Sequence, residues 1–173
     1  YVSEIAAAGA LNVERHLYEK IIYILRGFGA TEVWSNGDDK KKIQFEWQQG
    51  SLFAIPLNCS HRMINGSRDP AMFLAVTSAP LMIDLLHDIP FVFGCNYSFD
   101  ERFNGRADYF VPTTERNFQG GFFNWESNFI ADARGARRGC DGDLRGGGAR
   151  HAVGDRRQVQ PQGEGPRSGG GAR

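Results

Sequence analysis

Seven short runs of residues that favour β-strands, with Gly, Asn and Pro between them, occupy most of the first 77 residues. They are residues 1–5, 21–25, 30–35, 42–47, 51–55, 61–64 and 71–77. In the fourth run Ile43, Phe45 and Trp47 alternate with polar residues, which places three large apolar side chains on one strand face. Asn36 and Gly37 form a strong hairpin signal, because a type I′ turn needs positive φ at both central positions. Short strands at this spacing predict an all-β fold, a closed antiparallel sandwich or barrel.

The period of the apolar residues changes after these runs. Ser78 can cap a helix, and Pro80 suits the first helical turn, where a missing N–H costs nothing. An apolar stripe follows, and Pro90 ends it. Its members are Leu81, Met82, Leu85 and Leu86. We therefore predict one short helix packed on the barrel, with His87 interacting with the dipole at its C-terminus.

A sharp change in composition divides the chain after residue 130. All 13 Phe residues precede it, as do all Trp, Tyr, Ile and Met residues. Residues 131–173 contain 12 Gly and nine Arg against five acidic residues, and no aromatic residue. A segment of this kind buries too little apolar surface to offset the entropy of ordering. We therefore predict a disordered Gly/Arg/Ala-rich tail.

Two interpretations of this tail are open. Arg- and Gly-rich segments can bind RNA through charge and stacking, but this one has no Arg-Gly-Gly repeats, no interleaved aromatic residues and a diluted charge. The second interpretation is an out-of-frame translation of a GC-rich gene, because such codons encode Gly, Ala and Arg. We favour the second, which sequencing of the locus would test. Since Tyr1 opens inside a predicted strand, both ends suggest a fragment.

The composition of the chain also limits the kinds of partner and the cellular compartment that we expect. Residues 91–130 are aromatic but aperiodic, which predicts an irregular arm with a strand near residues 121–125. Three cysteines cannot form a full disulfide framework and fit a reducing, cytoplasmic compartment. No apolar run approaches the roughly 20 residues of a transmembrane helix, so we expect no membrane partner. Basic and acidic residues number 20 each, which gives no electrostatic case for a nucleic-acid partner.

The residues around His61 follow a recognisable frame. Gly50 is followed after five residues by Pro56, then at set intervals by Asn58, His61 and Asn65. This frame resembles the second motif of the cupin superfamily at the Gly, Pro, His and final Asn. Asn58 replaces the second Gly of that motif, and Asn also tolerates positive φ. The resemblance implies a β-jelly-roll barrel of the cupin (RmlC-like) type.

A second frame begins at Glu14 and runs through His16, Glu19 and Lys20 to Gly27. It resembles the first cupin motif, whose usual form is His-x-His, three or four residues, Glu, six residues and Gly. In that family three His and one Glu bind a divalent metal inside the barrel. The resemblance, which covers about residues 1–80, therefore implies that His16 and His61 are metal ligands.

This chain departs from the first motif at two places. Glu14 stands at the first His and, counting back from Gly27, Lys20 stands at the usual Glu. Glu14 shares the strand parity of His16 and could supply a carboxylate, whereas Glu19 has the opposite parity and reaches the metal only if the turn slips by one residue. Two His and one carboxylate suit Fe(II), while Lys20 would repel a divalent cation.

Two states of this site are therefore open. In one, a divalent Fe, Mn, Ni or Zn ion is bound at Glu14, His16 and His61, with Glu19 as a further candidate. In the other, the barrel is degenerate and hydrogen bonds satisfy both imidazoles. Cys59 is expected to be a small packing residue rather than a thiolate ligand.

The predicted organisation has three parts. An N-terminally incomplete cupin barrel covers residues 1–90, an arm or linker toward a second barrel covers residues 91–130, and the disordered tail covers residues 131–173. The aromatic arm resembles the segment that follows the first barrel of a two-cupin protein.

Two functions are consistent with the resemblance. Intact relatives are expected to be metal-dependent small-molecule enzymes of the oxygenase type, and Tyr23 and Phe45 could line the pocket for a small organic acid or aromatic compound. The alternative is a non-catalytic barrel with a degenerate metal site. Such a barrel would bind a small-molecule ligand or form a homo-oligomer through its edges. The substituted first motif favours the alternative for this chain.

Overall fold

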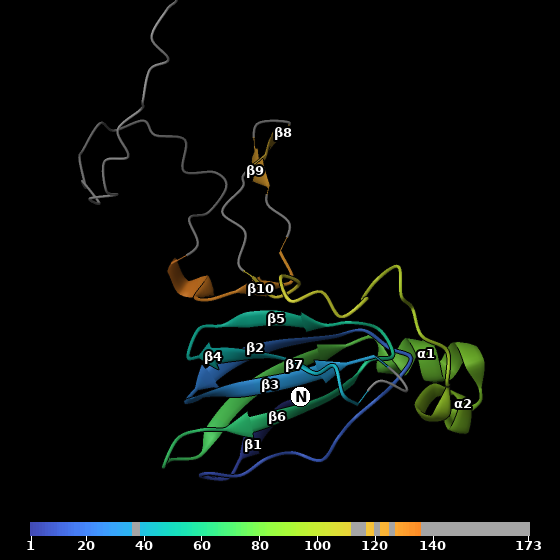
Figure 1. The fold of residues 1–173 in the computed structure, drawn as a ribbon, viewed down its shortest axis with the longest axis horizontal. Coiled ribbons are helices and arrows are strands. Elements are labelled where there is room, and N and C mark those ends of the chain that lie inside the picture. The colour runs from blue at the N-terminus through green and yellow to red at the C-terminus, as the bar shows by residue number, and fades with distance from the viewer. Residues whose placement is uncertain (36–38, 112–116, 120–121, 125–126, 136–173) are drawn as a thin grey trace, which may run out of the picture. The chain divides into compact units, whose positions relative to one another are not determined.

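A computed structural model of the chain describes residues 1–35, 39–111, 117–119, 122–124 and 127–135. The barrel strands are β1 (Val2–Ile5), β2 (Lys20–Arg26), β3 (Phe28–Trp34), β4 (Ile43–Gln48), β5 (Leu52–Ile55), β6 (Ser60–Asn65), β7 (Ala71–Thr77) and β10 (Phe129–Ile130). One sheet has the order β1-β7-β2-β5-β10 and the other has the order β4-β3-β6, with antiparallel pairing throughout (Figure 1). The predicted all-β fold is confirmed, and each of the seven predicted runs overlaps one strand.

The hydrophobic core lies between the two sheets, because inward side chains of both belong to one buried cluster. On β2 the buried residues Ile22 and Ile24 alternate with more exposed ones. On β4 Phe45 and Trp47 are buried, whereas the polar residue between them, Glu46, is exposed. Burying each such side chain contributes about 1.5–3 kcal/mol to folding. The same alternation decides which side chains reach the barrel interior.

Three turns depend on a positive φ. Gly27 and Gly50 both have φ 93°, and a Cβ at Gly27 would lie 2.7 Å from the Cβ of Ala71. Asn58 has φ 57°, as expected of a residue that replaces a motif Gly. Only a few residue types adopt this conformation at low cost. The hairpin predicted at Asn36 and Gly37 lies outside the described residues.

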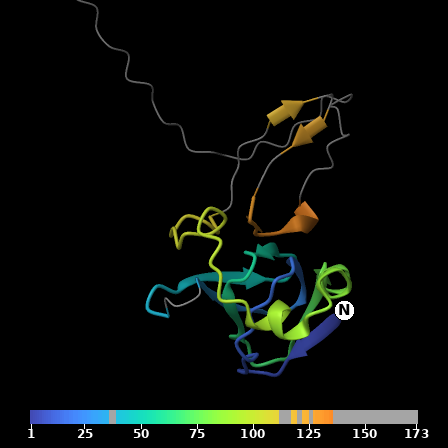
Figure 2. The same cartoon turned by 90° about the vertical axis from the view of Figure 1, so that its right-hand side faces the viewer.

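Two helices follow β7, where the sequence predicted one. They are α1 (Ala79–Leu86) and α2 (Ile89–Gly94), and they lie together at one end of the sheets (Figures 1 and 2). Pro90 falls in the first turn of α2 rather than ending α1. The predicted packing of α1 on the barrel is wrong, because α1 has no buried residue and Leu81 and Leu85 are 66% and 68% exposed. Periodicity identified the helix but not what covers its apolar stripe.

The helix ends use backbone and side-chain contacts that the sequence only partly indicated. Ser78 is the N-cap of α1, but its hydroxyl accepts a hydrogen bond from the Glu19 N–H at 3.0 Å. His87 ends α1 in a left-handed conformation, with its backbone N–H donating to the Ile83 carbonyl. Within the described part of the chain, no helix is long and apolar enough to cross a membrane.

Part of the segment after residue 91 contributes to the barrel core. Phe103, Phe110 and Phe129 are buried in the same cluster as the strand residues, and β10 pairs with β5 through Phe129 and Phe53. Two further strands, β8 (Asn117–Gln119) and β9 (Phe122–Asn124), form an antiparallel pair, and β9 falls where a strand was predicted. A second barrel beyond this segment stays a prediction.

The first residues of the predicted tail are ordered against the barrel. A short 3-10 helix covers Ala133–Gly135, and the Ala133 N–H donates to the Gly50 carbonyl at 2.8 Å. The Ser51 hydroxyl donates to the Ala131 carbonyl, also at 2.8 Å. At residues 131–135 the structure therefore differs from the predicted disorder, because hydrogen bonds to its backbone groups hold this segment beside Gly50 and Ser51. Residues 136–173 lie outside the described residues, so disorder and a frameshift there stay predictions.

The barrel edges differ in how they are covered. The outer edge of β6 is covered by the segment after β1, where the Leu11 N–H donates to Met63 and the Asn65 N–H donates to Gly9. β1 is the terminal strand of its sheet and pairs with β7 on one side. A homo-oligomer formed through such an edge stays a prediction.

Candidate functional site

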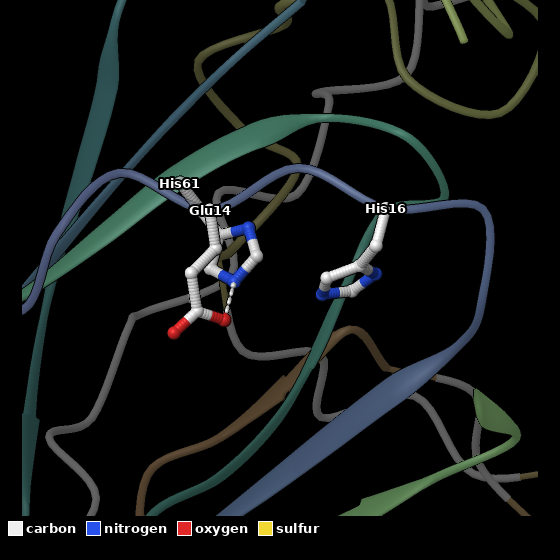
Figure 3. Close-up of side chains that lie close together, drawn as sticks. All are labelled: Glu14, His16 and His61. Atoms are coloured by element: carbon white, nitrogen blue, oxygen red, sulfur yellow. Dashed lines mark ion pairs between the residues drawn. The ribbon is translucent and has the colours of Figure 1, made fainter. Parts of the chain in front are cut away.

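The segment between β1 and β2 brings Glu14 beside His61 on β6. The backbone N–H of each residue donates to the carbonyl of the other at 2.9 Å, which forms an isolated antiparallel bridge. His16 follows two residues later, and its ring meets the His61 ring edge-on with the centroids 5.3 Å apart. The three side chains lie close together in Figure 3. The structure thus brings together three of the four predicted ligands.

A backbone carbonyl two residues away orients each imidazole. Nδ1 of His16 lies 3.0 Å from the Tyr18 carbonyl, and Nδ1 of His61 lies 3.3 Å from the Cys59 carbonyl. Because a carbonyl only accepts, Nδ1 donates in both contacts. This arrangement leaves Nε2 of each ring for other partners, as in histidines that ligate metals. Nε2 of His16 is buried and has no hydrogen-bond partner among the described residues.

The His16 ring is neutral at physiological pH. Burial, together with the neighbouring His61 ring and Lys20 ammonium, lowers the pKa of His16 to about 4. The Tyr18 ring stacks on the imidazole, with the centroids 3.6 Å apart and the planes nearly parallel. Nε2 of His16 therefore presents an unshared lone pair in a buried position.

Lys20 is a fourth member of this cluster. It is the first residue of β2, and its side chain points inward on the same face as Ile22, leaving the residue 1% exposed. Its ammonium donates a hydrogen bond to Oε2 of Glu14 at 2.6 Å. The same nitrogen lies 3.5 Å from Nε2 of His61. A buried cation thus lies against two of the three predicted donors.

Glu14 carries the negative charge of the cluster. Its side chain is 39% exposed, and its Oε2 lies 3.6 Å from Nε2 of His61, the contact drawn as a dashed line in Figure 3. The His61 ring and the Lys20 ammonium lower the pKa of Glu14 to about 2, although burial acts in the opposite direction. At neutral pH a carboxylate therefore faces an ammonium.

The three predicted donors are close enough to share one cation. The ligand atoms of Glu14, His16 and His61 all lie within 4.8 Å of one another. Two imidazoles and a carboxylate suit a first-row divalent metal. However, the Lys20 ammonium already contacts the carboxylate and one imidazole. The donor set is suitable for a metal, but with Lys20 in this position the cluster does not fit one.

A recess of about 610 Å³ is lined by residues of the cluster and by aromatic side chains. Its lining consists of Tyr1, Val13, Glu14, Arg15, His16, Tyr18, Ser60 and Phe93. Tyr18 and Phe93 meet edge-on with the centroids 5.9 Å apart. Neither residue was predicted from the sequence to line the site. Tyr18 lay within the first frame, whereas Phe93 lies on α2, a helix that the sequence did not indicate.

The other predicted site residues lie elsewhere. Glu19 is outside the cluster, and its exposed carboxylate lies 3.5 Å from the Arg102 guanidinium. Tyr23 is half-buried on the face of β2 opposite to its inward residues. Phe45 is in the hydrophobic core and stacks on Phe110 with the centroids 4.1 Å apart.

Cys59 packs in the core, as the sequence predicted. Burial and the Asp100 carboxylate raise the pKa of Cys59 to about 12. The thiol therefore stays protonated at neutral pH and offers no thiolate to a metal. Its carbonyl, rather than its sulfur, contributes to the site by orienting His61.

Residues 3–107, more than half of the chain, match the family model described as Cupin. The chain belongs to the cupin family. No curated protein matches it. The motif residues that carried the resemblance, from His16 through Asn65, all lie within the matched range.

Several solved structures are similar to this cupin. The coconut allergen cocosin is 17% identical, with a TM-score of 0.41, and the match covers 46% of this chain and 23% of that chain. The CENP-C cupin domain of Drosophila melanogaster is 10% identical, with a TM-score of 0.41 and coverages of 44% and 54%. Oxalate decarboxylase of Lactobacillus farciminis is 19% identical, with a TM-score of 0.38 and coverages of 51% and 31%. This chain therefore spans less than two thirds of each of these proteins.

Proposed function

We propose that this cupin barrel is a non-catalytic module that binds a small organic molecule and holds no resident divalent metal. The contact that supports this proposal is the 2.6 Å hydrogen bond between the buried Lys20 ammonium and the Glu14 carboxylate. It engages the one carboxylate of the donor set with a positive charge that the protein itself supplies. The remaining donors, His16 and His61, carry no negative charge with which to attract a cation.

The electrostatic cost of adding a metal is large. A divalent ion about 4 Å from the ammonium would be repelled by about 8 kcal/mol at an effective dielectric constant of 20. The ion could avoid this repulsion only if the Lys20 side chain left its place. Lys20 is 1% exposed, so leaving would break its contacts with Glu14 and His61. Both routes favour the metal-free cluster.

The recess beside the cluster supports a small-molecule ligand. Tyr18 and Phe93 supply aromatic walls, and the neutral His16 ring lies next to Tyr18. Pockets of this size with a few polar groups and aromatic walls bind small organic molecules. A compact aromatic compound or a small organic acid fits this lining.

A second candidate function is a metal-dependent enzyme of the oxygenase type. One observation favours it, namely the three donor atoms within 4.8 Å of one another at Glu14, His16 and His61. A bound metal would act there as a Lewis acid that orients substrate. This function requires Lys20 to move out of the cluster.

Metal analysis of the purified full chain separates the two candidates. The protein is expressed in medium supplemented with Fe, Mn, Ni and Zn, and the bound metal per chain is measured. We expect an amount far below one equivalent, unchanged by His61→Ala. One equivalent that His61→Ala removes would overturn the proposal and support the enzyme.

Ligand binding is tested by NMR on the full chain labelled with ¹⁵N-histidine. A panel of small aromatic and carboxylic compounds is added, and the His16 side-chain signals are followed. We expect a subset of the panel to shift them saturably and Tyr18→Ala to weaken that binding, while His87→Ala leaves it unchanged. A panel that shifts no His16 signal in the wild-type chain would contradict the ligand-binding function.

A further inference from the structure

The direction of the Lys20 side chain is fixed by the sheet. Lys20 pairs with Ile55 on β5 and with Thr77 on β7, so strands flank its backbone on both sides. Its side chain therefore points inward, on the face that carries Ile22 and Ile24. Any side chain at position 20 is aimed at Glu14 and His61.

The donors around this ammonium are already oriented by the protein. The two imidazoles are held by carbonyls at Nδ1, and Glu14 is held beside His61 by a pair of backbone hydrogen bonds. These constraints do not involve Lys20. A different group at position 20 would therefore meet the same donors.

The buried Nε2 of His16 is the independent sign that this arrangement suits a ligand. The residue is 3% exposed, and nothing among the described residues satisfies the atom. Buried polar atoms are almost always satisfied, so an exception calls for an explanation. Lys20 satisfies Glu14 and approaches His61, but no contact in the described part of the chain satisfies Nε2 of His16.

We propose that the Lys20 ammonium acts as a built-in cation in place of a divalent metal ion, and that this one residue prevents the cluster from binding metal. A carboxylate at position 20 would end one atom earlier than the ammonium does, which leaves space for an ion. It would complete a set of two imidazoles and two carboxylates, which suits Mn²⁺, Fe²⁺, Co²⁺ or Ni²⁺. This inference rests on the proposed metal-free state of the wild-type chain.

The test is a metal titration of the full chain and three variants. Lys20→Glu supplies the carboxylate, Lys20→Met removes the ammonium without adding a donor, and Lys40→Glu makes the same charge change at an exposed position. Free Mn²⁺ is followed by electron paramagnetic resonance, and bound Co²⁺ by its visible absorption. We expect Lys20→Glu to bind one ion at least about a hundred-fold more tightly than the wild type. Removing a group that only orients a metal ligand already lowers metal affinity by up to about a hundred-fold, and Lys20→Glu supplies a ligand itself.

The other variants define the contributions of charge and donor number. Lys20→Met should bind metal more weakly than Lys20→Glu but more tightly than the wild type, because the repulsion is gone and three donors remain. Lys40→Glu should behave as the wild type. Adding His16→Ala to Lys20→Glu should remove most of the gained affinity, since Nε2 of His16 is expected to be a ligand.

Folding is checked by circular dichroism and by thermal unfolding with and without Co²⁺. If Lys20→Glu needs metal to fold, Co²⁺ should restore its folded signal, and this result supports the inference. If the folded Lys20→Glu and Lys20→Met variants both bind metal no better than the wild type, the inference is overturned while the proposed metal-free function stands. A wild-type chain that itself binds one equivalent overturns both.

Discussion

The buried Lys20 ammonium makes the stability of the barrel depend on one carboxylate. Glu14→Gln keeps the shape of the side chain but removes the charge that faces Lys20 at 2.6 Å. Lys20 is 1% exposed, so water reaches its ammonium only from the side of Glu14, whose side chain is 39% exposed. Removing one partner of a buried ion pair costs about 3–5 kcal/mol, because the other charge is left uncompensated. Because the Glu14 end of the pair is partly exposed, we expect Glu14→Gln to lower the free energy of unfolding by about 3 kcal/mol, the lower end of this range.

The reverse substitution should cost much less. Lys20→Met removes the buried cation, and the Glu14 side chain that remains is 39% exposed and can be hydrated. We expect a change of less than about 1 kcal/mol, because replacing buried charge by an apolar group of similar volume is often neutral or stabilising. The stability of the double variant should be close to that of Lys20→Met, since the ammonium that Glu14→Gln leaves uncompensated is then absent.

The assay is urea unfolding at neutral pH, followed by Trp fluorescence, with equal m-values required for comparison. Glu4→Gln is the matched control, because Glu4 and Arg26 form an ion pair at 3.5 Å in which both side chains are more than half exposed. That control should change stability by less than about 1 kcal/mol. The reasoning is refuted if Glu14→Gln costs no more than Glu4→Gln, or if Lys20→Met costs as much as Glu14→Gln.

Three further predictions concern other parts of the barrel. Because the pKa of His16 falls from 6.5 in the unfolded chain to about 4 in the fold, the unfolded state takes up the proton first. Stability should therefore decrease as the pH falls from 6.5 toward 4, by about 2 kcal/mol at pH 5, and His16→Gln should reduce that decrease in urea unfolding at pH 7 and pH 5. Phe45→Ala should cost about 3–5 kcal/mol, because it empties the position between Phe53, Phe110 and Phe129, whereas Phe28→Ala, at a residue 55% exposed, should cost far less in the same assay. The Asn58 side-chain amide donates hydrogen bonds to the Cys95 and Tyr97 carbonyls at 3.1 and 2.7 Å. Asn58→Ala should be less stable than Asn58→Gly by about 1 kcal/mol in thermal or urea unfolding, since both variants lose these bonds but only Ala is strained at φ 57°; equal stabilities would contradict the role of the backbone conformation.

The strands and turns were predictable because local chemistry determines them. The alternation at Ile43, Phe45 and Trp47 reports directly which face of β4 is buried. Positive φ at Gly27 and Asn58 is a property of the turn itself, so two residue types suffice to indicate it. At these positions the residue type alone is enough to predict the local backbone structure.

Features that depend on distant contacts were harder to predict. The apolar stripe of α1 indicated a helix, but a stripe does not report whether another element covers it, and Leu81 and Leu85 are exposed. Tyr23 lies on the outer face of β2. Alternation along the strand places it opposite to Lys20, but alternation alone does not report which of the two faces is turned inward. Phe110 and Phe129 join the core from an aperiodic segment, for which no local pattern exists.

At the candidate site the sequence supplied the residues but not their interactions. It placed Glu14 and His16 with one parity, and the structure brings both to His61. The sequence also indicated that Lys20 would repel a metal, but it did not predict that the Lys20 ammonium contacts Glu14 and His61 within the cluster. Whether a long side chain reaches a particular oxygen depends on the separation of β2 from the segment that carries Glu14, which no spacing along the chain encodes. The 2.6 Å contact is therefore information that only the fold provides.

The charge of the cluster explains why the metal-free state is self-consistent. With His16 neutral, the Glu14 carboxylate and the Lys20 ammonium compensate each other, and the buried group needs no further ion. A divalent ion added to this set would leave an excess of positive charge beside the buried Lys20 ammonium. Exchanging Lys20 for a carboxylate reverses that balance, since two carboxylates without a cation would repel each other. One residue thus determines whether the same imidazoles surround an internal ammonium or require an ion from solution.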